Sequence, residues 1–187
     1  DCLIIPGGFS YGDYLRAGAI AKFSPIMKSV VEFANKGGLV FGICNGFQVL
    51  VESELLPGAL ITNNKVKFLS REVTLKVSSN SSPFTKELNI GDVLKMPIAH
   101  KQGNYQINDD GLKQLQDNNQ IAFTYYQKDG GSPNGSVGDI AGILNEKKNV
   151  LGMMPHPERA AEDILSSQDG LKIFQSLLSI AWLNLKQ

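Results

Sequence analysis

Residues 39–48 read LVFGICNGFQ, an apolar run followed by a cysteine between two glycines. This order predicts a buried strand that turns sharply into a helix, with Cys44 at the turn. Gly42 and Gly46 have no Cβ atoms, so the chain can adopt a strained conformation that presents the thiol to a substrate. The turn also puts the sulfur at a helix N-terminus, where the helix dipole favours the thiolate. A buried structural cysteine is the alternative interpretation.

A second segment offers a base for this thiol. Residues 154–158 follow the strand-like residues 150–153 and contain two prolines, which keep them out of a helix. Residues two apart in an extended chain point to the same side, so the Glu158 carboxylate can orient the His156 imidazole. A thiol, an imidazole and a carboxylate are the side chains of a catalytic triad, whatever their distance in sequence.

The turn after the first apolar strand is suited to hold a developing negative charge. Leu3–Ile5 is followed by Pro6-Gly7-Gly8, whose backbone amides are free of bulky side chains. The amide of Gly8, together with that of Asn45 directly after the cysteine, would form an oxyanion hole. An ordinary turn at a strand end is the alternative.

Three motifs, in this order along the chain, resemble those of the class I (triad) glutamine amidotransferase family: Pro6–Gly8, residues 42–48 and Pro155–Glu158. Further stretches are similar to the glutaminase subunits of phosphoribosylformylglycinamidine synthase within that family: residues 6–21, 97–100 and 133–143. The resemblance covers essentially the whole chain. It implies an α/β fold with an open, mostly parallel, flavodoxin-like sheet flanked by helices.

The resemblance also implies a reaction. Cys44 would attack the carboxamide of glutamine, and His156, oriented by Glu158, would protonate the departing ammonia and then activate water against the thioester. Five further residues would hold glutamine or lie near its pocket: Gln48, His100, Gly103, Asn104 and Tyr105. For His100, a purely structural role is also open.

The chain departs from the family in two places. A Gly-Glu-Gly-Arg type run usually follows Ala-His, whereas residues 101–104 read KQGN and lack its acidic and basic side chains. Gln102 and Asn104 would face either glutamine or the synthase, and we favour the synthase because polar turns commonly lie on the surface. Family members also begin with another strand and helix. We therefore expect residues 1–187 to form a single amidotransferase domain, incomplete at its N-terminus relative to the family.

Composition narrows the function classes. The 187 residues are 42% apolar, enough for the core of one domain. Lys plus Arg and Asp plus Glu number 18 each, without a basic cluster, so we expect no nucleic-acid or membrane partner. Neither a membrane-length apolar run nor a signal peptide is present, which favours the cytoplasm. Cys2 and Cys44, the only cysteines, are too few for a zinc site, and we expect no metal.

The ammonia needs an acceptor. The chain has no Gly-x-x-x-x-Gly-Lys-Ser/Thr loop and no acidic magnesium cluster, so we expect no cofactor in it. By the resemblance, ATP and Mg²⁺ belong to a partner synthase subunit of the PurL type. That subunit converts formylglycinamide ribonucleotide to formylglycinamidine ribonucleotide in de novo purine biosynthesis, often with a small accessory subunit of the PurS type. Residues 11–16 and 129–138 are candidates for the contact.

Two other functions stay open. One is a cysteine enzyme of the DJ-1/PfpI type, which shares a cysteine at a sharp strand-to-helix turn, here the elbow at Cys44, but should lack the His-Pro-Glu segment. The other is a non-catalytic scaffold subunit, against which the presence of all three triad residue types argues.

Periodicity predicts the main elements around these motifs. We expect a helix over residues 25–35 after the cap Ser24, a strand over 39–43 and a helix over about 46–54. Strand-like alternation recurs in residues 72–77, 93–98 and 121–126. At the C-terminal end, four apolar residues at helical spacing predict one buried face: Leu171, Phe174, Leu178 and Trp182.

Overall fold

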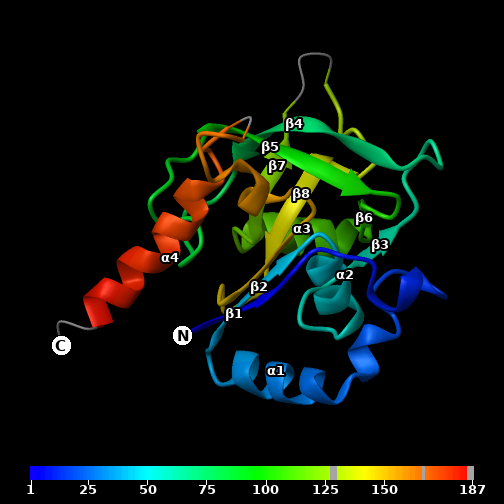
Figure 1. The fold of residues 1–187 in the computed structure, drawn as a ribbon, viewed down its shortest axis with the longest axis horizontal. Coiled ribbons are helices and arrows are strands. Elements are labelled where there is room, and N and C mark those ends of the chain that lie inside the picture. The colour runs from blue at the N-terminus through cyan, green and yellow to red at the C-terminus, as the bar shows by residue number, and fades with distance from the viewer. Residues whose placement is uncertain (127–129, 166, 185–187) are drawn as a thin grey trace.

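The structure is a computed structural model that describes residues 1–126, 130–165 and 167–184 (Figure 1). Among these residues, seven strands form one sheet in the order β1-β2-β9-β8-β7-β4-β5, and β3 and β6 form a small second sheet. The strands are β1 (Cys2–Ile5), β2 (Leu39–Ile43), β3 (Ala59–Ile61), β4 (Leu69–Val77), β5 (Val93–His100), β6 (Asn104–Gln106), β7 (Ile121–Tyr125), β8 (Ile140–Leu144) and β9 (Val150–Met153). The α-helices are α1 (Pro25–Asn35), α2 (Asn45–Glu52), α3 (Asp109–Asp117) and α4 (Leu171–Asn184). Short 3-10 turns are η1 (Ser10–Asp13), η2 (Ala21–Phe23), η3 (Val137–Asp139) and η4 (Pro157–Ala160).

The α/β architecture with flanking helices is confirmed, but the sheet is more mixed than the mostly parallel one expected. Strands β1, β2 and β9 run parallel to one another. The other neighbours in the described sheet, from β9 through β8, β7 and β4 to β5, pair antiparallel. The reason is the connections: only residues 145–149 join β8 to β9, and a parallel pair would need a crossover of a dozen residues or more.

Helix α1 follows its sequence signals closely. It begins at Pro25, whose missing N–H costs nothing at a first helical position, and it ends before Gly37, which has φ of 91°. Its buried residues recur every three or four positions and belong to the main core with β2: Met27, Val30 and Ala34. The predicted boundaries of this helix are confirmed.

Helix α4 differs from the predicted apolar stripe. Ile173 is buried and Phe174 packs against the core, whereas Leu178 is 59% exposed. Leu178 follows Ile173 by five residues, about one and a half helical turns, so it lies on a different face of α4, and the predicted face was wrong at this position. The side chain of Trp182 lies outside the described residues.

The parallel part of the sheet gathers the motifs. Because β1, β2 and β9 run in the same direction, the segments that follow them leave the same edge of the sheet. These segments are residues 6–9, the start of α2, and residues 154–158. In Figure 1, β1 and β2 lie side by side with α2 next to their ends.

Candidate active site

Cys44 forms the turn between β2 and α2 and carries the backbone strain itself. Its φ of 51° and ψ of −104° are unusual for a residue with a side chain, and its N–H donates to Met153 O at 2.8 Å. The flanking glycines have another role, because a Cβ at Gly46 would clash with the carbonyl oxygen of Ile5 and one at Gly42 would lie 2.5 Å from Leu50. They allow α2 to pack closely on β1 and β2.

The Cys44 thiol is buried and protonated. Only 4% of the residue is exposed, and this burial raises the pKa of the thiol to about 12. A hydrogen bond from the backbone N–H of Asn45 and the charge of Arg159 lower the pKa, but they do not offset burial. Sγ lies 3.7 Å from Ala99 O, to which it donates. The thiol therefore needs a base to take its proton.

His156 lies beside Cys44 and is held by Glu158. Its ring nitrogen Nδ1 is 2.6 Å from Glu158 Oε1, and the backbone N–H of His156 donates to the backbone oxygen of Pro97 at 2.8 Å. A Cβ placed on Gly7 would lie 2.7 Å from His156 Cε1 and 3.6 Å from Cys44 Cβ, so imidazole and cysteine border the same glycine. Nε2 is buried without a hydrogen-bond partner among the described residues. The structure thus brings the three predicted triad residues together.

Of the two predicted oxyanion donors, the structure shows one in contact with the thiol. The backbone N–H of Asn45 donates to the Cys44 sulfur. Gly8 follows Gly7, and no atom lies within 4 Å of the position where its Cβ would be, so its surroundings are open. The side chain of Asn45 fixes this arrangement, because Oδ1 accepts from Ser10 N–H at 3.1 Å and Nδ2 donates to Gln48 Oε1 at 2.8 Å.

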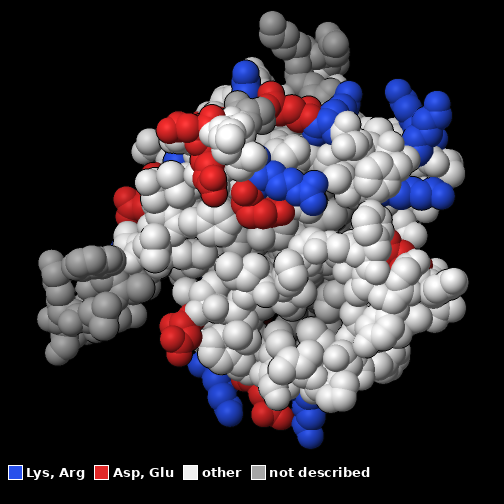
Figure 2. All heavy atoms as spheres, in the orientation of Figure 1, with Lys and Arg blue, Asp and Glu red and all other residues white. Residues whose placement is uncertain are grey.

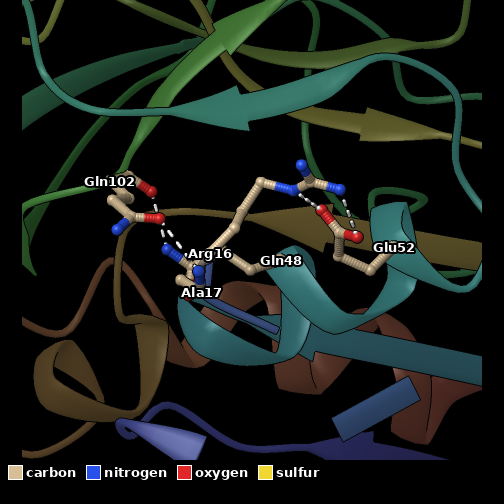
Figure 3. A network of polar contacts seen from close by, with 5 residues as sticks. All are labelled: Arg16, Ala17, Gln48, Glu52 and Gln102. Carbon is tan, nitrogen blue, oxygen red and sulfur yellow. Dashed lines mark hydrogen bonds and ion pairs between the residues drawn. The ribbon is translucent and has the colours of Figure 1, made fainter. Parts of the chain in front are cut away.

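Gln48 and the turn after β5 are linked through Gln102 (Figure 3). Gln48 Nε2 donates to the backbone oxygen of Gln102, at 2.6 Å, and the Gln102 side chain accepts from Ala17 N–H at 2.9 Å. The Gln102 side chain is therefore bound within the chain. It joins the segment after β1 to α2, a role that neither sequence interpretation, facing glutamine or facing the synthase, had included.

His100 is buried and bonded to Asn63, a residue that sequence reasoning missed. Asn63 Oδ1 lies 3.1 Å from His100 Nδ1 and accepts from Gly103 N–H at 3.0 Å, while Nδ2 donates to the backbone oxygens of Lys67 and His100. Burial, followed by the nearby His156, lowers the pKa of His100 to about 4. Nothing in the polar run Thr62-Asn63-Asn64 distinguishes Asn63 from a surface residue.

Asn104 and Tyr105 make contacts within the chain, and their role in holding glutamine stays a prediction. Tyr105 is fully buried, stacks on Phe47 with ring centroids 6.0 Å apart, and donates through its hydroxyl to Pro57 O. Asn104 donates to Thr62 O at 3.4 Å. Both belong to β6, where alternation turns Tyr105 into the core of the small sheet.

The described part of the chain holds neither a metal-binding cluster nor a membrane-spanning helix. Its residues include no group of three or more His, Cys, Asp or Glu side chains that could hold a metal ion. Across the same ranges, no helix is both long enough and apolar enough to span a bilayer.

Comparison with known proteins gives the relatives of this chain. A family model described as a CobB/CobQ-like glutamine amidotransferase domain matches residues 1–178. The phosphoribosylformylglycinamidine synthase subunit PurQ of Sulfurimonas denitrificans is 57% identical over 180 residues, which are 95% of this chain and 80% of that subunit.

Two solved structures extend the comparison. One chain of the Thermotoga maritima PurLQS structure superimposes with a TM-score of 0.87 at 44% identity, covering 96% of this chain and 79% of that one. The glutaminase domain of Trypanosoma brucei CTPS, solved with bound acivicin, has a TM-score of 0.59 at 14% identity, covering 96% of this chain and 71% of that one. At that identity, the second likeness shows the shared fold alone.

Proposed function

The chain belongs to the PurQ family of glutamine amidotransferases, and we propose from this premise that it is the glutaminase subunit of a phosphoribosylformylglycinamidine synthase. It hydrolyses glutamine to glutamate and ammonia, and the ammonia passes to a synthase subunit. The observation that carries the mechanism is the position of Cys44 beside His156, with Glu158 holding the far side of the imidazole.

The triad geometry assigns the first proton transfer. Because Glu158 accepts from Nδ1–H of His156, the second ring nitrogen, Nε2, is left as the acceptor for a proton. His156 takes the thiol proton as Cys44 attacks the carboxamide carbon, so that sulfur forms a bond to carbon while the carbonyl oxygen becomes an oxyanion. The high pKa of the buried thiol means that this transfer accompanies the attack.

The remaining steps use the same groups. The amides of Asn45 and Gly8 stabilise the oxyanion, and His156 returns its proton to the amide nitrogen as ammonia leaves. His156 then removes a proton from water, which attacks the thioester and releases glutamate. Gln48 and Gly103, positioned by Gln102 and Asn63, border the substrate, while His100 supports the turn between them.

We propose partners of the PurL and PurS types, because a solved structure that this chain matches with a TM-score of 0.87 is that of PurLQS from Thermotoga maritima. No cofactor is proposed for this chain, and ATP and Mg²⁺ belong to the synthase subunit. Membership in a purine-biosynthesis family supports a cytoplasmic location. The DJ-1/PfpI alternative is weakened by the His156–Glu158 pair, which its members should lack.

The segment Phe9–Arg16 is the proposed contact with the synthase subunit. It exposes four large apolar or aromatic side chains, between 57% and 92% accessible: Phe9, Tyr11, Tyr14 and Leu15. The middle of the right-hand edge of Figure 2, where this dark-blue segment of Figure 1 lies, shows mostly uncharged residues, while Lys and Arg side chains gather above it. Exposed apolar groups of this kind are typical of a protein interface.

The second candidate contact with the synthase, residues 129–138, stays a prediction, and its described part also makes contacts within the chain. Residue 129 lies outside the described residues. Asn134 is fully buried and donates to Gly103 O at 2.7 Å, and Ser136 Oγ accepts from Tyr105 N–H at 3.0 Å. These contacts support the turn that carries Gly103.

The proposal is tested by Cys44→Ala in the reconstituted complex. Glutamine-dependent synthesis should be abolished, while ammonia-dependent synthesis stays nearly intact because the thiol serves only to release ammonia. Cys2→Ala is the control, since Cys2 lies in β1 and should leave both activities unchanged. Loss of both activities in Cys44→Ala would contradict this division of labour.

A labelling experiment separates the enzyme from the scaffold alternative. A glutamine-like electrophile such as diazo-oxo-norleucine should form an adduct on Cys44 and leave Cys2 unlabelled, as read by mass spectrometry of the peptides. A folded complex that stays unlabelled would favour a non-catalytic scaffold.

A further inference from the structure

The turn η1 contains two buried polar atoms that the mechanism does not use. Within the described residues, neither Ser10 Oγ nor Asp13 Oδ1 has a hydrogen-bond partner. Partial burial also raises the pKa of the Asp13 carboxyl above its usual value. Buried polar groups almost always have partners, so unpaired groups on one turn indicate a place where a ligand supplies them.

This turn borders the reacting thiol. Ser10 N–H donates to Oδ1 of Asn45, the residue after Cys44, and the chain beyond the turn is held where Ala17 N–H donates to the Gln102 side chain. The negative charge of Asp13 also raises the pKa of Cys44, so the carboxylate lies within electrostatic reach of the sulfur.

Two arginines, Arg16 on the same segment and Arg159 next to the triad residue Glu158, already have carboxylate partners. Arg16 binds Glu52 through two nitrogens, and Arg159 lies 3.6 Å from Glu158. The ion pairs found among the described residues do not include Asp13. Because neither arginine pairs with Asp13, its carboxylate is available to a cationic group of a ligand.

The backbone holds this carboxylate in a strained position. Tyr11, Gly12 and Asp13 have consecutive φ angles of 52°, 65° and 55°, in the left-handed region that side-chain-bearing residues avoid. Strain of this kind persists where surrounding contacts enforce it, and it concentrates at ligand sites. The Asn45 and Gln102 contacts provide the enforcement.

We propose that Asp13 binds the α-ammonium group of the substrate glutamine and that Ser10 Oγ donates a hydrogen bond to its α-carboxylate. This inference rests on the proposed function and deepens it, because it names the residues that recognise the amino-acid end while Cys44 reacts with the carboxamide. The ammonium supplies the charge-assisted partner that Asp13 lacks. The site then selects free glutamine over a glutamine within a peptide, whose nitrogen is an uncharged amide.

The test compares two ligands that differ in one group. Glutaramate, 4-carbamoylbutanoate, keeps the carboxamide and the carboxylate of glutamine but has no α-amino group. Binding of each to the reconstituted complex is measured by calorimetry in a Cys44→Ala background, where neither is consumed. Asp13→Asn should weaken glutamine binding by roughly 10- to 100-fold, as loss of a charge-assisted contact does, and change glutaramate binding by less than about twofold. Ser10→Ala should weaken both ligands equally.

A matched control exists in the same fold. Asp139 ends η3 as Asp13 ends η1, has the same φ of 55°, and follows a left-handed glycine, Gly138. Asn tolerates this conformation, so both Asp→Asn changes keep the backbone. Asp139→Asn should leave the affinity ratio of glutamine to glutaramate unchanged.

Three results would overturn the inference. In one, Asp13→Asn weakens both ligands equally, which indicates a structural role. In another, glutamine binding is unchanged. In the third, only the coupled synthesis falls, which assigns Asp13 to the synthase contact. Failure of the proposed function is distinct from all three, because then a complex with intact Cys44 binds glutamine and discriminates it from glutaramate, yet releases no ammonia.

Discussion

The two turns that border the thiol are held in opposite ways. The elbow at Cys44 is buried, and its flanking glycines allow backbone and side chains to pack against it closely. The turn η1 is largely exposed and is tied down by hydrogen bonds to Asn45 and Gln102. Both contain left-handed residues, but packing enforces the first and polar contacts enforce the second.

The packed turn is suited to position the nucleophile, and the turn held by hydrogen bonds is suited to adapt to ligands. A packed turn cannot shift without a clash, which suits a sulfur that must meet one carbon and one imidazole nitrogen. A turn held by a few hydrogen bonds can adjust at low cost and can expose apolar side chains to a partner. We therefore expect substitutions in the packed turn to have larger effects than substitutions that remove the polar contacts of η1.

The largest effect is expected at His156. His156→Ala should reduce glutamine-dependent synthesis nearly as much as Cys44→Ala, because the buried thiol then has no base. Glu158→Gln should cost less, on the order of 10⁴-fold in kcat against on the order of 10⁶-fold for loss of the base, because the carboxylate orients the base and does not itself react. Steady-state kinetics of the complex would measure both. If Glu158→Gln matches the unsubstituted protein, Glu158 is not part of the triad.

The next effect tests the packing at the elbow through Gly7. An alanine Cβ there would lie 2.7 Å from His156 Cε1, so the imidazole must move away from Cys44. Displacements of about 1 Å cost roughly 100-fold in rate, and Gly7→Ala should lower kcat by that order with little loss of stability. Gly91→Ala is the control for kcat, because its Cβ also meets open space and Gly91 is no part of the proposed site; its φ of 93° affects stability and not the kcat of the folded protein. Similar kcat values for the two variants would show that the imidazole tolerates the shift.

The sequence predicted those features of the site that depend on neighbouring residues. The elbow strand 39–43, helix α1 and the triad motifs could be predicted because each depends on local signals: an apolar run, a proline cap, and residues two apart in an extended chain. The pairing of Asn63 with His100, the link from Gln102 to Ala17, and the burial of Tyr105 could not. Each depends on which distant segment the fold brings near, and a single sequence does not record that.

The glycines of the elbow show the same limit in another form. The sequence correctly placed them at the turn, but they are needed there for another reason than the backbone strain that we expected of them. Cys44 itself takes the strained conformation, and Gly46 is required because α2 approaches Ile5 of β1. A glycine can be needed because another segment packs closely against it or because its own backbone is strained, and the sequence shows glycine in both cases.

A third prediction concerns pH and the buried His100. Its pKa in the folded protein, about 4, lies below the usual 6.5, so the unfolded chain binds more protons between these values and stability falls as pH falls through that window. The loss from pH 7.5 to pH 5 should be about 2 kcal/mol from this residue alone. Urea unfolding at the two pH values would measure it. His100→Gln should remove that part of the dependence, and an unchanged pH dependence in the variant would contradict the assignment.

The smallest effects test what holds η1. Gln102→Met removes the acceptor of the buried Ala17 N–H and should destabilise the fold by about 1–2 kcal/mol at any salt concentration, because an unpaired buried donor is not screened. Arg16→Met removes the pair with Glu52, whose arginine is about half exposed, and should cost less than about 1 kcal/mol, falling further in high salt. Urea unfolding of both variants at low and high salt distinguishes the two contacts. If Arg16→Met lost more stability than Gln102→Met, the ion pair with Glu52 would be the main contact that holds η1. The contrast between the two turns would then be one of packing against charge, and no longer one of packing against neutral hydrogen bonds.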